Sequence, residues 1–187
     1  MKVTSQRPAP RAARPVAIHN GYHGLRFSRA AIASMIHALD AHASLFTPHT
    51  SSRTSRASRL APPSPHDGCP PGDISLAFLT DVALAGIHGA FLNNPATTDV
   101  ITFEGEPAYG TAGEICVSVD TARTYARKHG SDFSTELTLY LVHGWLHLAG
   151  YDDLQPAEKR RMRAAEKRAM ALLAALGAMP RFLIDKS

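Results

Sequence analysis

Apolar residues recur at helical spacing over two long segments in the C-terminal part of the chain. From Ser134, a suitable N-cap, the pattern predicts a helix that runs to Ala149. Pro156 suits the first position of a second helix that extends to about Leu176. Its apolar stripe includes Met162, Ala165, Ala169 and Leu173, and its Lys and Arg residues lie largely on the opposite face: Lys159, Arg160, Arg163, Lys167 and Arg168.

Earlier in the chain, shorter patterns predict alternating strands and helices. Apolar runs over 16–19, 74–79, 99–103 and 114–119 predict strands, and helices are expected over 28–43, 81–92 and, capped by Asp120, to about 129. A chain of 187 residues with 44% apolar content can bury one core of ordinary size. We therefore expect a single α+β domain over 16–177, followed by a C-terminal tail over 178–187.

Two segments lack this patterning. Residues 1–15 combine basic residues with prolines and contain no apolar run, which favours a flexible basic arm over a secretory signal. Residues 47–72 are rich in Ser, Thr, Pro, Arg and Gly, so we expect a disordered insertion there. No run approaches the ~20 apolar residues of a membrane span. Cys69 and Cys116 lack a C-x-x-C partner, which suits free thiols in the cytoplasm.

The chemistry-bearing residues are concentrated at the end of the helix that runs to Ala149. His143 and His147 are four residues apart, so both rings lie on one helix face, where they can bind a single metal ion. Gly150 favours a sharp turn that brings Asp153 toward them. Two imidazoles and one carboxylate leave a coordination position open, which is typical of catalytic zinc sites. The other interpretation of Asp153 is a solvated N-cap for the last helix.

The residue after the first histidine separates two kinds of zinc enzyme. Zinc proteases with this spacing carry a glutamate there, which acts as general base. In this chain the position is Gly144. A metallopeptidase therefore becomes the weaker alternative.

The string H-G-W-L-H-L-A-G-Y-D-D at 143–153 resembles the signature of the YbeY family, metal-dependent bacterial endoribonucleases of ribosomal RNA maturation and ribosome quality control. Residues 98–103, T-D-V-I-T-F, and 113–118, G-E-I-C-V-S, resemble two further strand motifs of that family. The matches fall in the family's order and cover roughly residues 74–153, with a looser fit from Val16 onward.

This resemblance implies a small twisted mixed sheet flanked by helices, with a zincin-like metal helix at the mouth of a cleft. It implies cleavage of single-stranded ribosomal RNA, on the ribosome or its small subunit. We expect one divalent metal ion, with zinc as the first choice, held by His143, His147 and Asp153, and we take Asp152 as the candidate catalytic proton acceptor beside the two histidines. The alternative is a metal-binding, ribosome-associated factor without nuclease activity.

Other side chains near the motif have two interpretations each. Glu136 lies seven residues before His143 and could orient its ring, or it could be a surface carboxylate. Trp145 and Tyr151 could stack on a base or pack in the core.

Two positions depart from the family's pattern. Asp153 stands where the family has a third histidine, and its charge should make the metal less electrophilic and shift the preference toward oxygen-loving ions such as manganese. Leu92 stands where the family generally has an arginine that engages RNA phosphate. We consider Arg123, Arg127 and Lys128 as replacements, with a solvated helix face as the alternative interpretation.

Formal charge is unevenly distributed about the net value of +4. Residues 73–153 carry 11 acidic residues against three basic ones, residues 155–187 carry eight basic against three acidic, and residues 1–72 carry nine basic against two acidic. We expect the basic ends, with Arg53, Arg56 and Arg59 of the insertion, to contact RNA phosphate and the acidic middle to hold the metal. Basic ends that only improve solubility are the alternative.

Overall fold

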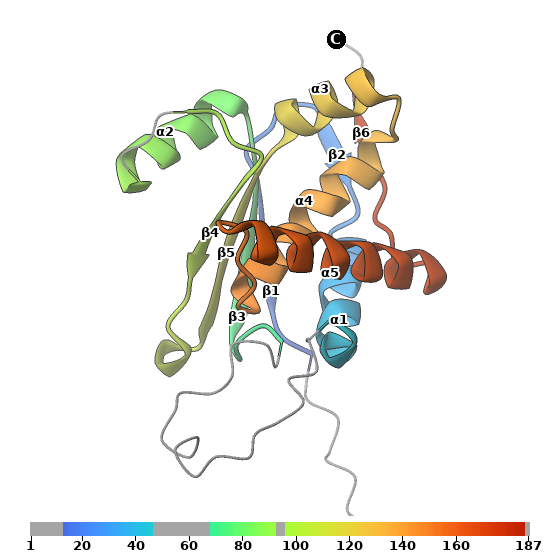
Figure 1. Ribbon diagram of the computed structural model, residues 1–187. Helices are drawn as coiled ribbons and strands as arrows, with labels where there is room; N and C mark the ends of the chain where they lie inside the picture. The colour runs from blue at the N-terminus through green and yellow to red at the C-terminus, as the bar shows by residue number, and fades with distance from the viewer. Residues whose placement is uncertain (1–12, 47–67, 93–95, 186–187) are drawn as a thin grey trace, which may run out of the picture.

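The computed structural model describes residues 13–46, 68–92 and 96–185, and its centre is a four-stranded mixed sheet (Figure 1). The strands lie in the order β1 (Val16–Asn20), β3 (Asp73–Leu79), β5 (Thr111–Ser118) and β4 (Val100–Glu104). The first three are parallel, and β4 is antiparallel to β5. A two-stranded antiparallel sheet pairs β2 (Leu25–Phe27) with β6 (Phe182–Ile184). The predicted α+β fold with a small mixed sheet is confirmed.

Five α-helices flank the larger sheet within the described residues (Figure 1). They are α1 (Arg29–Ala41), α2 (Asp81–Leu92), α3 (Val119–His129), α4 (Phe133–Leu148) and α5 (Pro156–Ala175), and 3-10 turns cover Ala43–Leu45 and Pro107–Tyr109. Side chains alternate along β5. Ile115 and Val117 therefore join the main core with α1, α4 and α5, whereas Cys116 joins a smaller cluster with Leu84 of α2.

Two helices begin with caps other than the predicted ones. The Ser118 hydroxyl, rather than Asp120, accepts the N–H of Thr121 at the start of α3, 3.0 Å away. Asp132, rather than Ser134, caps α4. The Ser134 hydroxyl accepts the N–H of Phe182 at 3.0 Å and so ties α4 to β6.

Near both ends of the domain, the structure shows contacts that the sequence did not predict. The segment predicted as a C-terminal tail contains β6, whose three residues are too few to show strand alternation. Arg14, at the end of the predicted arm, lies with its Nε 2.6 Å from Asp40 Oδ2. Residues 1–12 and 47–67 lie outside the described residues, so the flexible arm and the insertion, with its three arginines, stay predictions. No helix in the described part is long and apolar enough to cross a membrane.

Candidate active site

A close contact between α4 and the sheet fixes where the motif helix lies. A Cβ atom on Gly144 would be only 2.4 Å from Ile115 Cγ2 of β5 and 3.2 Å from Thr102 Cγ2 of β4. Only glycine allows this approach, because real Cβ contacts are not shorter than about 3 Å. Trp145, 1% exposed, donates from its indole Nε1 to Asp40 Oδ1 at 3.2 Å and so attaches α4 to α1. The helix is therefore held from two sides.

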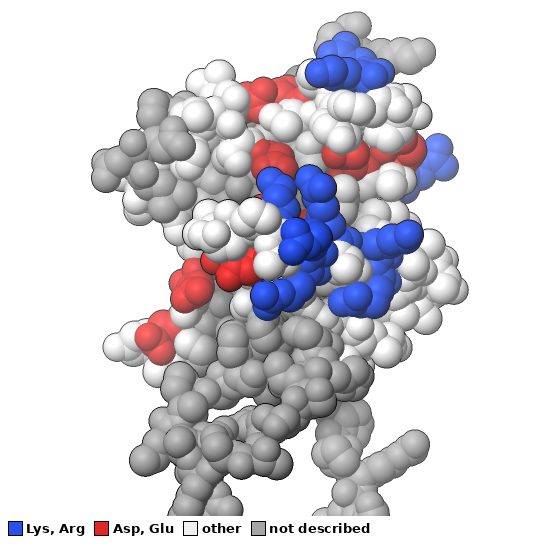
Figure 2. All heavy atoms as spheres, in the orientation of Figure 1, with Lys and Arg blue, Asp and Glu red and all other residues white. Residues whose placement is uncertain are grey.

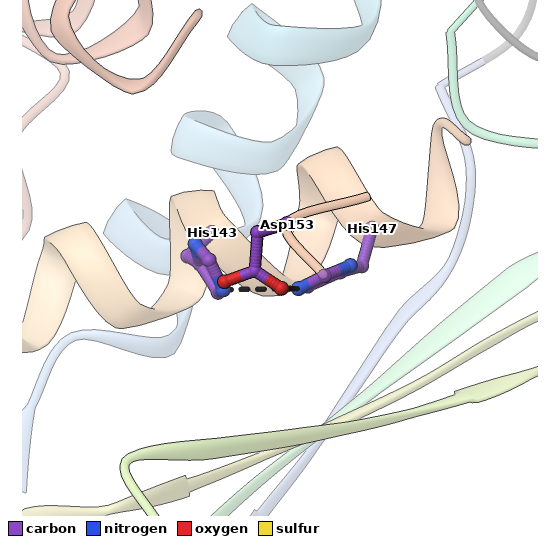
Figure 3. Close-up of side chains that lie close together, drawn as sticks. All are labelled: His143, His147 and Asp153. Atoms are coloured by element: carbon purple, nitrogen blue, oxygen red, sulfur yellow. Dashed lines mark hydrogen bonds and ion pairs between the residues drawn. The ribbon is translucent and has the colours of Figure 1, made fainter. Parts of the chain in front are cut away.

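The two histidines and Asp153 converge at the end of α4 (Figure 3). Gly150 has a φ of 88°, as the predicted turn requires, and the N–H of Tyr151 donates to the carbonyl of Leu146 at 3.0 Å. This turn returns the chain so that Asp153 Oδ1 lies 3.9 Å from His147 Nε2. One ligand atom from each of His143, His147 and Asp153 lies within 4.8 Å of the others.

The outer nitrogens of both rings are occupied, which sets the tautomers. His143 Nδ1 lies 2.6 Å from Glu166 Oε1 of α5, and His147 Nδ1 lies 3.0 Å from the carbonyl oxygen of Tyr151. Both partners are acceptors, so we assign the ring proton to Nδ1 in each case. Each Nε2 then carries a lone pair directed toward the shared centre.

The spacing of the inner nitrogens fits a metal ion. The two Nε2 atoms lie 2.9 Å apart. Two lone pairs at this distance repel each other unless a proton or a metal ion lies between them. Two imidazole ligands of a tetrahedral zinc ion stand ~3.3 Å apart, so a shift of a few tenths of an ångström would accommodate zinc. The donor set of two imidazoles and a carboxylate also matches a catalytic zinc site.

Neighbouring charges act differently on the two rings. Burial lowers the pKa of His143, but the hydrogen bond and charge of Glu166, with smaller contributions from Asp99 and Asp153, outweigh this effect and raise it. Burial lowers the pKa of His147, and the proximity of His143 lowers it further. The carboxylates around the site therefore favour positive charge at its centre.

A cavity of about 550 Å³ adjoins these residues. Its lining includes four carboxylates and two cations: Asp99, Glu136, Asp153, Glu166, Lys159 and Arg163. Thr98, Thr121, Tyr125, Tyr140 and His143 also line it. Two of the candidate ligands, His143 and Asp153, therefore line the same recess as acidic, basic and aromatic groups, whereas His147 is not among its lining residues.

The other candidate residues have varied positions. Asp152 is exposed, and its Oδ1 accepts the N–H groups of Asp153 at 2.6 Å and Leu154 at 3.1 Å. Glu136 lines the cavity, but the carboxylate that contacts His143 is Glu166. Trp145 and Tyr151 are buried, in agreement with packing in the core.

Sequence reasoning did not single out Glu166 or Asp99, and it included Lys159 and Arg163 only within a basic C-terminal part expected to contact RNA phosphate. Arg123, Arg127 and Lys128 are exposed on α3 and are not among the cavity-lining residues, and the side chain of Leu92 lies outside the described residues. The available signal was the spacing of Lys159, Arg163 and Glu166, which share one face of α5. The sequence could not show that this face of α5 lies against His143 of α4.

Known proteins decide between the kinds of chemistry that such a site can perform. A family model described as Endoribonuclease YbeY matches residues 58–174. The chain belongs to the endoribonuclease YbeY family. A relative from Parabacteroides distasonis, named Endoribonuclease YbeY, is 36% identical over 102 residues, which cover 54% of this chain and 72% of the relative. One from Protochlamydia amoebophila, with the same name, is 40% identical over 106 residues, covering 54% and 70%.

A solved structure supports the fold of this YbeY family member. The solution structure of TM1509 from Thermotoga maritima matches with a TM-score of 0.52 at 18% identity, covering 87% of this chain and 92% of that one. At this identity the match supports the fold alone and carries no information on the reaction.

Proposed function

We propose that this protein is a metal-dependent endoribonuclease that hydrolyses phosphodiester bonds in single-stranded ribosomal RNA, in ribosome maturation and quality control in the cytoplasm. The observation that carries the proposal is the convergence of His143, His147 and Asp153 next to a cavity that His143 and Asp153 line, in a chain of the YbeY family. A metallopeptidase is not favoured, because Gly144 faces the sheet, where a glutamate would meet Ile115.

In this proposal His143, His147 and Asp153 hold one divalent ion, with zinc as the first choice. When bound, such an ion supplies Lewis acidity toward a phosphoryl oxygen and makes a nearby water easier to deprotonate. Glu166 and the Tyr151 carbonyl fix the two imidazoles with their lone pairs directed inward. The ligands are thus oriented before the substrate arrives.

A proton acceptor is needed for the attacking water. Asp152 stays a prediction for this role, although two backbone N–H groups already occupy its Oδ1. Asp99 and Glu136 line the cavity and are further candidates. Comparing Asp152→Asn, Asp99→Asn and Glu136→Gln in single-turnover cleavage separates them, because the acceptor's variant alone should lose about 10²–10⁴-fold in rate.

The proposal is tested with single-stranded ribosomal RNA fragments, purified protein of measured metal content, and a chelator. Wild type should cut internally, whereas His143→Ala and chelated protein should not. His23→Ala is the matched control, because His23 is exposed in the turn between β1 and β2. Equal cutting by wild type and His143→Ala would refute the catalytic role. No cutting with zinc or manganese, together with ribosome binding, would favour the alternative of a ribosome-associated factor.

The third ligand has its own test. Asp153→Ala should lower the bound metal measured by mass spectrometry under native conditions, and Asp153→His should retain it. Unchanged metal content in Asp153→Ala would mean that Asp153 is not a ligand.

A further inference from the structure

Two basic side chains line the cavity, and no acidic side chain among the described residues forms an ion pair with either of them. Lys159 and Arg163 lie one helical turn apart on α5, and both are exposed. Among the described residues neither forms an ion pair, although four carboxylates line the same cavity. Figure 2 shows Lys and Arg side chains gathered over α5, with acidic side chains next to them. These two cations are therefore available to an incoming anion.

The same helix also carries the group that contacts a candidate metal ligand. Glu166 follows Arg163 by three residues and Lys159 by seven, so the three share one face of α5. Since Glu166 Oε1 lies 2.6 Å from His143 Nδ1, this face is fixed against the site. Gln155 and Glu158 form a capping box at the start of α5, which holds its first turn in place. Lys159 and Arg163 are thus positioned by a rigid element.

Electrostatics require cations at this place. Asp99, Glu136, Asp153 and Glu166 would repel a phosphodiester from the cavity. A divalent ion offsets only part of this charge. With Lys159 and Arg163 added, the formal charges of the ion and the lining residues balance, so an RNA strand can approach.

We propose that Lys159 and Arg163 bind the phosphate backbone of the RNA beside the scissile bond. This inference rests on the proposed function and deepens it. The guanidinium of Arg163 offers two parallel donors to one phosphate, and the ammonium of Lys159 is a point charge for the same or the next phosphate. The cations of α3 that the sequence suggested do not line the cavity.

The test compares two charge-matched pairs on one helix. Lys159→Gln with Arg163→Gln removes the cavity cations, and Arg160→Gln with Arg161→Gln removes two exposed neighbours that do not line the cavity. Binding of a fluorescent single-stranded RNA of about ten nucleotides is measured by anisotropy in zinc-loaded protein, before measurable cleavage, over a range of salt concentrations. Urea midpoints and zinc content verify that all variants fold and load alike.

Loss of two phosphate contacts should make the slope of log Kd against log salt shallower by about 1.4, at roughly 0.7 per contact for single strands. The affinity difference from wild type should then shrink about sevenfold between 50 and 200 mM salt. The control pair should keep the wild-type slope. An unchanged slope in the cavity pair, or equal loss in both pairs, overturns the inference. Failure of wild type to cut RNA instead overturns the proposed function, because binding is measured separately from cleavage.

Discussion

Gly144 makes a sharp test of how the site is held in place, because two opposing effects act on its substitution. Gly144→Ala should stabilise α4 by about 1 kcal/mol, since alanine is the better helix former. The added Cβ would, however, meet Ile115 Cγ2 at 2.4 Å, about 1 Å closer than an ordinary contact. Overpacking in a rigid core costs about 1–3 kcal/mol.

The surroundings indicate that the unfavourable effect wins. Ile115 is fully buried on β5, between β3 and β4, so neither its side chain nor the strand can move aside easily. We therefore expect an overpacking cost at the upper end of its range, about 3 kcal/mol, and a net loss of about 2 kcal/mol, or roughly 4–8 °C in Tm for a chain of this size. Because α4 also carries His143, zinc affinity should fall with it.

A double-mutant cycle isolates the contact. Ile115→Ala alone should cost about 2–5 kcal/mol, because it leaves a cavity in the core. In that background Gly144→Ala should become neutral or stabilising, so the two changes should couple by about 2–3 kcal/mol. Gly86→Ala is the control, since a Cβ on this glycine of α2 meets no described atom within 4 Å. It should stabilise by about 0.5–1 kcal/mol.

The assay is urea denaturation of metal-free protein with equal m-values, repeated in zinc. If Gly144→Ala stabilises the fold as Gly86→Ala does, or if its cost is the same with and without Ile115→Ala, the packing argument is wrong. Gly144→Glu would give the chain the glutamate that zinc proteases carry at this position, but we expect a destabilised protein without peptidase activity.

Three further predictions concern single groups. Glu166→Ala should weaken zinc binding about 10–100-fold in a chelator competition, because His143 loses its orienting partner, and unchanged affinity would contradict that role. Burial raises the pKa of both the Cys69 and Cys116 thiols to about 12, so native protein should resist thiol labelling at pH 8 and react fully in urea; rapid native labelling would refute this burial. Burial raises the pKa of Glu136, so its ionisation costs stability above the folded pKa and nothing below the unfolded one. Metal-free Glu136→Gln should therefore gain stability over wild type at pH 7 and lose this advantage as the pH falls to 4, and a constant difference would contradict the sign.

Local patterns predicted the elements that have strong local signals. The apolar spacing around His143 and His147 predicted α4, and Gly150 predicted the turn that follows it. The N-cap of α4 could not be predicted from local sequence in the same way. Asp132 and Ser134 are both good N-cap residues, and the choice between them was decided by Phe182, which occupies the Ser134 hydroxyl from 48 residues away. A contact between residues so far apart in the chain cannot be predicted from the residues next to Ser134.

The short strands β2 and β6 show the same limit. Each has three residues, and their pairing joins the two ends of the described chain. Phe27, Phe78 and Phe182 pack together, with ring centroids 4.8 to 5.9 Å apart, so tertiary contacts rather than strand propensity stabilise this pair. A three-residue pattern cannot reveal partners so distant in sequence.

The acidic and basic groups of the cavity likewise could not be predicted from local sequence, because their arrangement depends on tertiary packing. On α5 the sequence separates an apolar stripe from a basic face, yet Lys159 and Arg163 lie at the border beside buried Met162. Whether such a border faces solvent or a cavity depends on the neighbouring element, and here α4 supplies His143 beside it. In the proposed interface the cations of one helix serve a site whose histidines lie on another helix, because a phosphate responds to charge in space and not to position in the chain. Sequence motifs thus find candidate ligands that are close together in the chain, whereas complementary charges must be sought across the fold.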